Sequence, residues 1–185
     1  MPSIVACAKT TPPRDRVRDA AAGLFADRGL DGFKMRDLAE RLGVSVMTPY
    51  RYFENKEAIL ACVRAHGYAC LADALDQGLA DAPPPLVDRV AALAVAYGRY
   101  VEAEPARYRL MFSLTPADGP GAAEVRRQEK RVEEVFAHAG SADLGRLLWS
   151  VLHGVTALHL GGQVPETGLT AALVRAATVF TGTTA

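Results

Sequence analysis

A net charge is what this sequence lacks most plainly. Its 185 residues carry 21 lysines and arginines against 21 aspartates and glutamates, so the formal net charge is zero. A protein that bound nucleic acid through bulk basicity would carry a large positive excess. Any surface for a polyanion must therefore be local and built from a few placed cations.

Cysteine is also scarce, and its spacing excludes several kinds of protein. The three cysteines are an odd number without zinc-finger spacing, which argues against a disulfide framework or a finger. Cys62, His66 and Cys70 recur at every fourth residue and share one side of a helix, where they could hold a metal or sense oxidation. A buried cysteine is more commonly a small apolar side chain, so we favour plain packing and predict no metal site.

The sequence also lacks an uninterrupted apolar run of membrane-spanning length, and residues 1–9 are too short and too lightly charged for a signal peptide. We therefore expect a cytoplasmic protein with no membrane partner. Half of the residues are hydrophobic, which is enough for a sizeable globular core. No phosphate-binding glycine loop, metalloprotease histidine pair or nucleophile elbow is present, so we predict no enzymatic activity and no cofactor.

The strongest positive signal lies at residues 33–56, FKMRDLAERLGVSVMTPYRYFENK. Its apolar positions recur with helical spacing at Met35, Leu38, Ala39 and Leu42. Gly43 follows where a helix ends in the left-handed conformation, and Ser45 is placed to cap a second helix that begins at Val46. Asn55 can cap a third helix and place Lys56 at its positive end, a ready site for a phosphate. Helix, glycine turn and short helix form the helix-turn-helix pattern of DNA binding.

Helical periodicity continues through the rest of the chain. A preceding helix has an apolar stripe at Val17, Ala20, Ala21, Leu24 and Phe25 and ends at Gly29. Later helices are expected at residues 55–80, 86–103, 105–112, 124–138, 142–160 and 169–181, with a loop at 115–121. The predicted fold is all-α: a disordered tail at 1–10, a three-helix helix-turn-helix DNA-binding bundle at 11–57, and a roughly six-helix regulatory domain for ligand binding and dimerisation at 58–185.

Two stretches resemble a known family. LAERLGVS followed by TPYRYFENKEAIL is similar to the DNA-binding region of the TetR family of bacterial transcriptional regulators, over about residues 14–60. AYGRYVEAEPARYRLMF and LLWSVLHGVTALHLGG resemble the ligand-binding half of one TetR subgroup, in which a Trp…His-Gly sequence recurs, here Trp149, His153 and Gly154. The family usually has a capping Thr or Ser where this chain has Phe33. The resemblance implies a repressor that binds a palindromic operator as a homodimer and is released by a small molecule.

The helix-turn-helix pattern and the resemblance together predict the residues that meet double-stranded DNA. Val46, Met47 and Thr48 occupy the first turn of the recognition helix, which reads base edges, while the flanking residues grip phosphates. The predicted set is Arg36, Ser45, Val46, Met47, Thr48, Tyr50, Arg51, Tyr52 and Lys56. One of the two tyrosines could instead pack in the bundle, and Phe53 is expected in the core.

Large or polarisable side chains spread over several later helices suggest a cavity for an apolar or aromatic effector. The predicted ligand-binding residues are His66, Tyr97, Tyr100, Tyr108, Met111, Phe112, Phe136, Trp149 and His153. The alternative is that these residues simply fill a helical core, which would leave a ligand-independent DNA-binding dimer. A small helical enzyme is the remaining alternative.

The helix at 142–160 is apolar on two faces, and we expect one of them to pack against a second chain. With the last helix it would form an isologous four-helix dimer interface. The predicted interface residues are Leu144, Leu148, Val151, Val155, Leu158, Leu169, Leu173, Ala177 and Phe180. The alternative is that both faces lie within the core of one chain.

Overall fold

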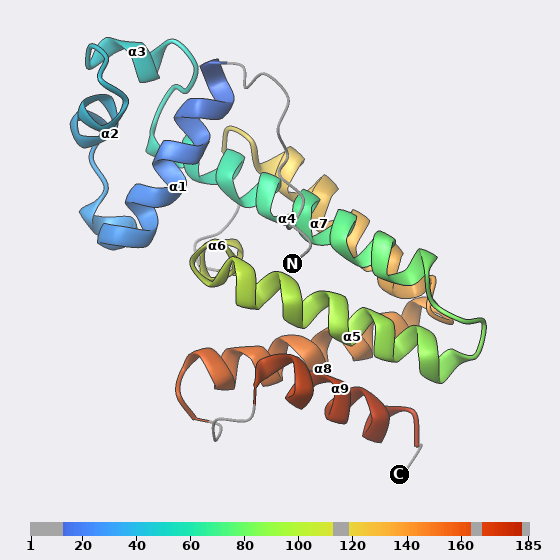
Figure 1. Cartoon of the computed structure of the whole chain (residues 1–185). Coiled ribbons are helices and arrows are strands. Elements are labelled where there is room, and N and C mark those ends of the chain that lie inside the picture. Colours follow the sequence, from blue (N-terminus) through green and yellow to red (C-terminus); the bar gives the residue numbers. More distant parts are fainter. Residues whose placement is uncertain (1–12, 113–118, 164–167, 183–185) are drawn as a thin grey trace.

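The computed structural model describes residues 13–112, 119–163 and 168–182, and these residues form helices without strands (Figure 1). The predicted tail at 1–10 and most of the predicted loop at 115–121 lie outside the described residues. The described helices are α1 (Pro13–Gly32), α2 (Met35–Leu42), α3 (Met47–Tyr50), α4 (Lys56–Ala80), α5 (Leu86–Ala103), α6 (Pro105–Met111), α7 (Ala122–Ala137), α8 (Ala142–Leu160) and α9 (Leu169–Phe180). The all-α prediction is confirmed.

The helices α1, α2 and α3 form a small bundle at one end of the molecule, closed by the first turns of α4 (Figure 1). Ile59, Leu60 and Val63 of α4 share its core with the apolar stripe of α1. Phe33 belongs to this core as well: it is 5% exposed and stacks on Phe25 with ring centroids 4.3 Å apart. The aromatic residue that replaces the family's capping Thr or Ser therefore contributes apolar burial instead of a side-chain cap.

The ends of these short helices follow the sequence in part. Gly43 has φ 67° and ψ 33°, the predicted left-handed cap, and the side chain of Asn55 accepts a 2.8 Å hydrogen bond from the amide of Ala58. The prediction for Ser45 is wrong: α3 begins at Met47, its N-cap is Val46, and no side chain caps it. The amide of Thr48 instead donates to the backbone oxygen of Ser45 at 2.9 Å.

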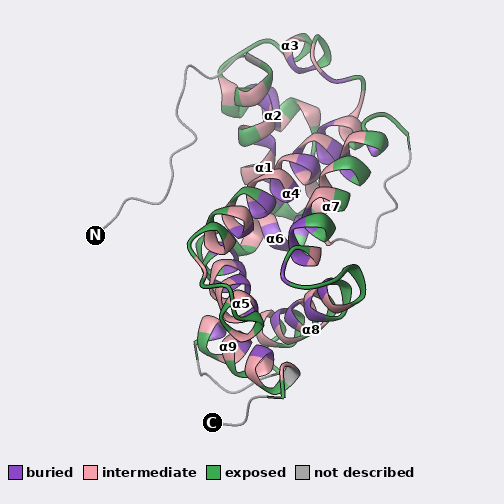
Figure 2. Ribbon diagram, turned by 90° about the vertical axis from the view of Figure 1, so that its right-hand side faces the viewer, coloured by how far each residue is buried: buried purple, intermediate pink, exposed green. Residues whose placement is uncertain are grey.

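Helix α4 leaves the bundle and runs the length of the second part, packed along α7 and α5 (Figure 1). It is long and apolar enough to cross a membrane, but half of that apolar window is buried within the protein, as in the core helix of a globular domain. Helices α5, α8 and α9 pack together at the far end. Buried and exposed positions alternate around each helix, so each has one inward face (Figure 2).

Candidate nucleic-acid interface and ligand pocket

The predicted recognition helix is the most exposed part of the bundle (Figure 2). Met47 is 68% exposed, Val46 47% and Tyr50 44%, whereas Pro49 in the same turn is buried and anchors α3. Large apolar side chains this exposed, clustered on one turn, are unusual on a surface that meets only water. They suit contact with the edges and methyl groups of bases.

The cations of the bundle divide into paired and unpaired groups. Arg28 pairs with Asp37, and Arg41 pairs with Asp27 at 2.8 Å. Among the described residues, these basic side chains of the bundle make no ion pair: Arg14, Arg16, Lys34, Arg36, Arg51 and Lys56. Three of the six, Arg36, Arg51 and Lys56, belong to the predicted DNA-binding set. Local unpaired cations can therefore supply the phosphate contacts that the zero net charge denies to the molecule as a whole.

The two tyrosines after α3 differ in their surroundings. Tyr52 is half-buried against the bundle core, and with Arg16 and Thr48 it lines a small depression of about 80 Å³ between α1 and α3. Tyr50 points out to solvent. The alternative in which one tyrosine packs in the bundle therefore fits Tyr52 better, and Tyr50 is the better candidate for a base contact. Phe53 is 3% exposed, as expected, and the guanidinium of Arg14 lies 5.0 Å from its ring centroid.

In the second part of the chain, α5, α6, α7 and α8 bring six of the predicted ligand-binding residues together. The ring of Phe112 lies 4.2 Å from that of His153, 4.7 Å from Tyr108 and 6.3 Å from Trp149. Trp149 stacks on Phe136 at 6.0 Å, and Phe136 lies 6.1 Å from Tyr97. The aromatic residues thus form one continuous cluster at the level of α6.

Polar atoms within the cluster form a hydrogen-bonded chain. The hydroxyls of Tyr97 and Tyr108 are 2.7 Å apart, and the Tyr108 hydroxyl is 2.6 Å from Nδ1 of His153. Burial raises the pKa of both tyrosines, so both hydroxyls keep their protons. Burial lowers the pKa of His153, which favours the neutral imidazole.

A depression of about 290 Å³ opens beside this chain and is lined by Tyr108, Arg109, Phe112, His153, Ala157, Leu160 and Gly161. Tyr108, Phe112 and His153 therefore line a pocket as predicted residues, while Tyr97, Phe136 and Trp149 lie behind them. Arg109 is a lining residue that the prediction missed. It precedes Phe112 by three positions, so helical spacing could have placed the two on one face.

Two predicted pocket residues have a different task. The Tyr100 hydroxyl donates to the backbone oxygen of Gly67 at 2.9 Å and lies 3.3 Å from the sulfur of Met111. Both side chains are buried between α4, α5 and α6 and do not line the pocket. They hold α6 against α4.

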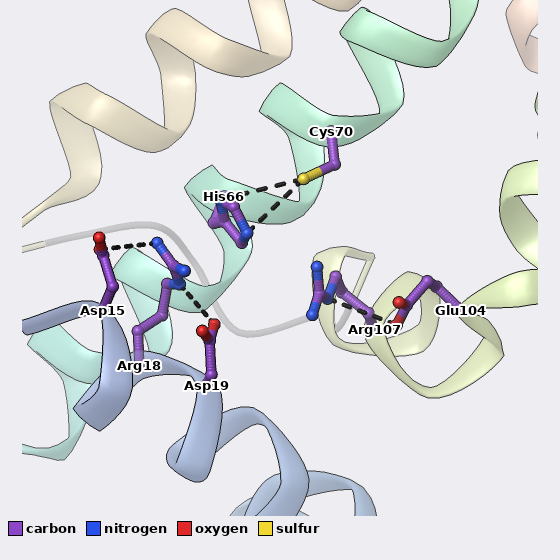
Figure 3. A network of polar contacts seen from close by, with 7 residues as sticks. All are labelled: Asp15, Arg18, Asp19, His66, Cys70, Glu104 and Arg107. Carbon is purple, nitrogen blue, oxygen red and sulfur yellow. Dashed lines mark hydrogen bonds and ion pairs between the residues drawn. The ribbon is translucent and has the colours of Figure 1, made fainter. Parts of the chain in front are cut away.

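His66 also lies outside this pocket, so the pocket gives no support to its place in the predicted ligand-binding set. It is on α4, with Arg18 of α1 on one side and Arg107 of α6 on the other (Figure 3). Its ring is 3.6 Å from the sulfur of Cys70. Burial, with Arg18 and Arg107, lowers the pKa of His66 to about 4. Within the described residues no three His, Cys, Asp or Glu side chains gather as metal ligands, so this junction gives no support to a metal site.

The predicted dimer surface needs a partial correction. Four of its residues are 0–2% exposed within the single chain and cannot add contact area to a second one: Leu148, Leu169, Leu173 and Ala177. For these four the prediction is wrong, because this face of α9 packs on α5 and this face of α8 packs on α7 and α9. The residues that remain accessible are the half-buried Leu144, Val151 and Val155 and the exposed Leu158. The side chain of Phe180 lies outside the described residues.

The accessible face of α8 carries an apolar stripe that includes Val151 and Leu158 of the predicted interface and also Leu147, which was not predicted. Leu147 is 58% exposed and Leu158 48%, and Val151 and Gly154 lie between them at helical spacing. An added Cβ at Gly154 would meet nothing within 4 Å. Val179 of α9 is 75% exposed. This stripe, Leu147, Val151, Gly154 and Leu158, is called the α8 stripe below.

Comparison with known families matches both parts of the chain. A family model described as "Bacterial regulatory proteins, tetR family" matches residues 17–63, which contain the helix-turn-helix. A second, described as "Tetracyclin repressor-like, C-terminal domain", matches residues 90–180, which contain the aromatic cluster and the α8 stripe.

Two repressors are similar to this chain in sequence, and solved structures share its fold. The HTH-type transcriptional repressor KstR of Mycobacterium tuberculosis is 27% identical over 127 residues, and that of Rhodococcus jostii is 30% identical over 127 residues. The matches cover 68% of this chain but only 57% and 58% of those repressors. A protein of unknown function from Rhodococcus sp. RHA1 has a TM-score of 0.74 at 23% identity, covering 94% of this chain and 96% of that one. The fatty acid degradation regulator FadR of Bacillus halodurans has a TM-score of 0.72 at 17% identity, covering 95% and 97%.

Proposed function

Because this chain belongs to the TetR family of transcriptional regulators, which are not enzymes, we propose that it binds operator DNA through α2, α3 and the start of α4. The observation that carries the proposal is the exposed turn at Val46, Met47 and Tyr50, flanked by the unpaired cations Arg36 and Lys56. The apolar turn supplies base contacts, and the cations supply phosphate contacts. Repression of the adjacent genes follows the relatives, which are named repressors. The proposed cellular location of the protein is the cytoplasm.

A homodimer is the proposed DNA-binding form. A single exposed turn offers few base contacts, and two copies related by a two-fold axis would double them on a palindromic operator. The α8 stripe is the surface that a second copy would cover, because its apolar residues recur along one face and its glycine permits close approach.

The proposed control is a small molecule in the pocket beside α6. This helix carries Tyr108, which lines the pocket, and Leu110, which belongs to the core of the N-terminal bundle. It is also tied to α4, because Arg64 and Tyr68 both donate to the backbone oxygen of Met111 at 3.2 Å. A ligand that shifted α6 would therefore bias the position of α4 and of the bundle, and so the spacing of two recognition turns. The proposed regulatory domain is residues 58–185. Its first residues, in the opening turns of α4, also pack against the DNA-binding bundle.

The proposal is tested by selecting bound sequences from fragmented genomic DNA with the purified protein and then measuring affinity for the selected site. Arg36→Ala should weaken binding to all sequences and lower the salt dependence of log K by about 0.9 for each phosphate that the variant no longer neutralises. Arg41→Ala is the matched control, because Arg41 is also an exposed arginine of α2 but is paired with Asp27. Equal effects of the two changes would remove Arg36 from the interface. Failure to enrich any sequence would contradict DNA recognition itself.

A further inference from the structure

The hydrogen-bonded chain behind the pocket has a direction that its own atoms determine. Tyr97 is fully buried, and its hydroxyl has two polar neighbours, the hydroxyl of Tyr108 at 2.7 Å and the indole nitrogen of Trp149. The indole nitrogen is a donor only, and within the described residues it makes no hydrogen bond of ordinary geometry. Among the described residues, the proton of Tyr97 can therefore be accepted only by Tyr108.

The rest of the chain follows from this first step. Since Tyr108 accepts from Tyr97, its own proton has two remaining acceptors, Nδ1 of His153 at 2.6 Å and the hydroxyl of Thr156. Of the two, only the contact with Nδ1 has ordinary hydrogen-bond geometry, so we assign the proton to it. The reverse order, in which His153 donates to Tyr108 and Tyr108 to Tyr97, would leave the Tyr97 proton buried without an acceptor. Burial lowers the pKa of His153 and favours its neutral form, and with Nδ1 accepting from Tyr108 the single ring proton lies on Nε2. The three side chains thus work as a relay that presents the pocket with an N–H donor.

A second donor stands at the same pocket. The guanidinium of Arg109 is exposed, pairs with no carboxylate among the described residues, and makes one long contact of 3.4 Å to the backbone oxygen of Leu160. Thr156 is fully buried beside the Tyr108 hydroxyl and does not line the pocket. The remaining lining is apolar, from Phe112, Ala157 and Leu160.

We propose that the pocket takes a small apolar carboxylic acid, bound as the anion with its carboxylate between Arg109 and Nε2–H of His153. A carboxylate is an acceptor only, so it satisfies both donors at once and is charged to match the guanidinium. An amine would place a donor against two donors and a cation beside Arg109. The volume of about 290 Å³ suits an acid of modest size, near the lower end for small-molecule sites. This ligand class rests on the proposed function, in which the pocket is the effector site.

The test compares three ligands with one apolar body: 4-phenylbutyrate, 4-phenylbutyramide and 4-phenylbutylamine, titrated calorimetrically into the full chain. The acid should bind at least tenfold more tightly than the amide, and the amine should show no binding. Arg109→Gln should bring the acid down to the affinity of the amide. Arg99→Gln, which removes an exposed arginine of α5 outside the pocket, should change nothing. An amine that binds as tightly as the acid, or no binding by any of the three, would overturn the ligand class.

The relay is tested separately by nitrogen NMR of histidine-labelled protein, which distinguishes the two neutral tautomers. The chain has four histidines, and His153→Gln identifies the signal of His153 by its loss. The relay predicts protonated Nε2 and unprotonated Nδ1, and Tyr97→Phe, which removes the proton that orders the chain, should mix the two tautomers. Protonated Nδ1 in the parent protein would overturn the relay. Neither measurement involves DNA, so loss of operator binding would count against the proposed function and leave these outcomes to decide the ligand class.

Discussion

The glycine at position 145 offers a direct test of how α7 and α8 are packed. A Cβ added there would lie 2.6 Å from the amide nitrogen of Ala137, 2.6 Å from the carbonyl carbon of Phe136 and 2.7 Å from its oxygen. All three are backbone atoms, and Phe136 is fully buried, so no exposed side chain can rotate to make room. Alanine at position 145 would force the helices apart by roughly 1 Å to restore ordinary van der Waals contact.

Gly154 on the same helix is the matched control, because an added Cβ there meets nothing within 4 Å. Both substitutions gain the helix propensity of alanine over glycine, about 0.8–1.0 kcal/mol each. This gain cancels between the two variants, so their difference in unfolding free energy is the overpacking cost at position 145, about 1–3 kcal/mol. At a protein concentration low enough for all three proteins to be monomeric, which removes any effect of Gly154 on the proposed dimer, Gly154→Ala should be more stable than the parent protein, and Gly145→Ala should be the less stable variant.

The assay is urea unfolding followed by circular dichroism, with the free energy of unfolding extrapolated to water. Measurements at two protein concentrations separate packing from association, because a change in dimer affinity alters stability with concentration and a packing cost does not. Trp149 fluorescence should also change in Gly145→Ala, because Phe136 stacks on that indole. Equal stability of the two variants would refute the close crossing of α7 and α8.

Two further predictions concern the α8 stripe and the α1–α4–α6 junction. Leu147→Glu should shift the protein from dimer to monomer in sedimentation while leaving its circular dichroism unchanged. Leu86→Glu, which changes an exposed leucine outside the α8 stripe, should leave the protein dimeric. A parent protein that is already monomeric would contradict the proposed dimer. Burial and the two arginines lower the pKa of His66 from 6.5 in the unfolded chain to about 4 in the folded protein. Between these values the unfolded chain binds more protons, so the free energy of unfolding should fall as the pH drops from 6.5 toward 4. His66→Asn should flatten that fall by about 1–2 kcal/mol after allowance for solvent screening. Identical pH profiles of the two proteins would contradict the lowered pKa of His66. The charged groups that act on His66, Arg18, Arg107, Asp15 and Asp19, are all retained in the variant, so the comparison isolates the imidazole.

Helix positions were predictable because apolar periodicity and local punctuation act over a few residues. The helices at 86–103 and 142–160 have the predicted bounds, and Ser141 caps α8 through a 3.2 Å hydrogen bond from Leu144. Ser45 failed as a cap because the chain after Gly43 is already turning tightly, and a backbone oxygen takes the hydrogen bond that its side chain would have accepted.

Which face of a helix turns inward was less predictable. Helical spacing grouped Leu148 with Leu144 and Leu158, but only tertiary packing decides that Leu148 is buried and Leu158 exposed. The same limit explains why the surroundings of His66 were not predicted, since the local sequence around this histidine does not indicate which other helices will pack beside it. The aromatic cluster was predictable as a set because its members are large. The hydrogen-bonded chain within it was not, because it joins residues of three helices at distances that depend on all of them.

Our main proposal is that this chain recognises a palindromic DNA site as a dimer through α2 and α3. It is tested most directly by measuring the mass of the complex formed with the DNA fragment that the protein itself selects from genomic sequence. The expected result is a dyad-symmetric site with two chains bound for each dyad, and weaker formation of that complex by Arg36→Ala but not by Arg41→Ala. A single chain bound to an asymmetric site, or no selected sequence at all, would contradict it.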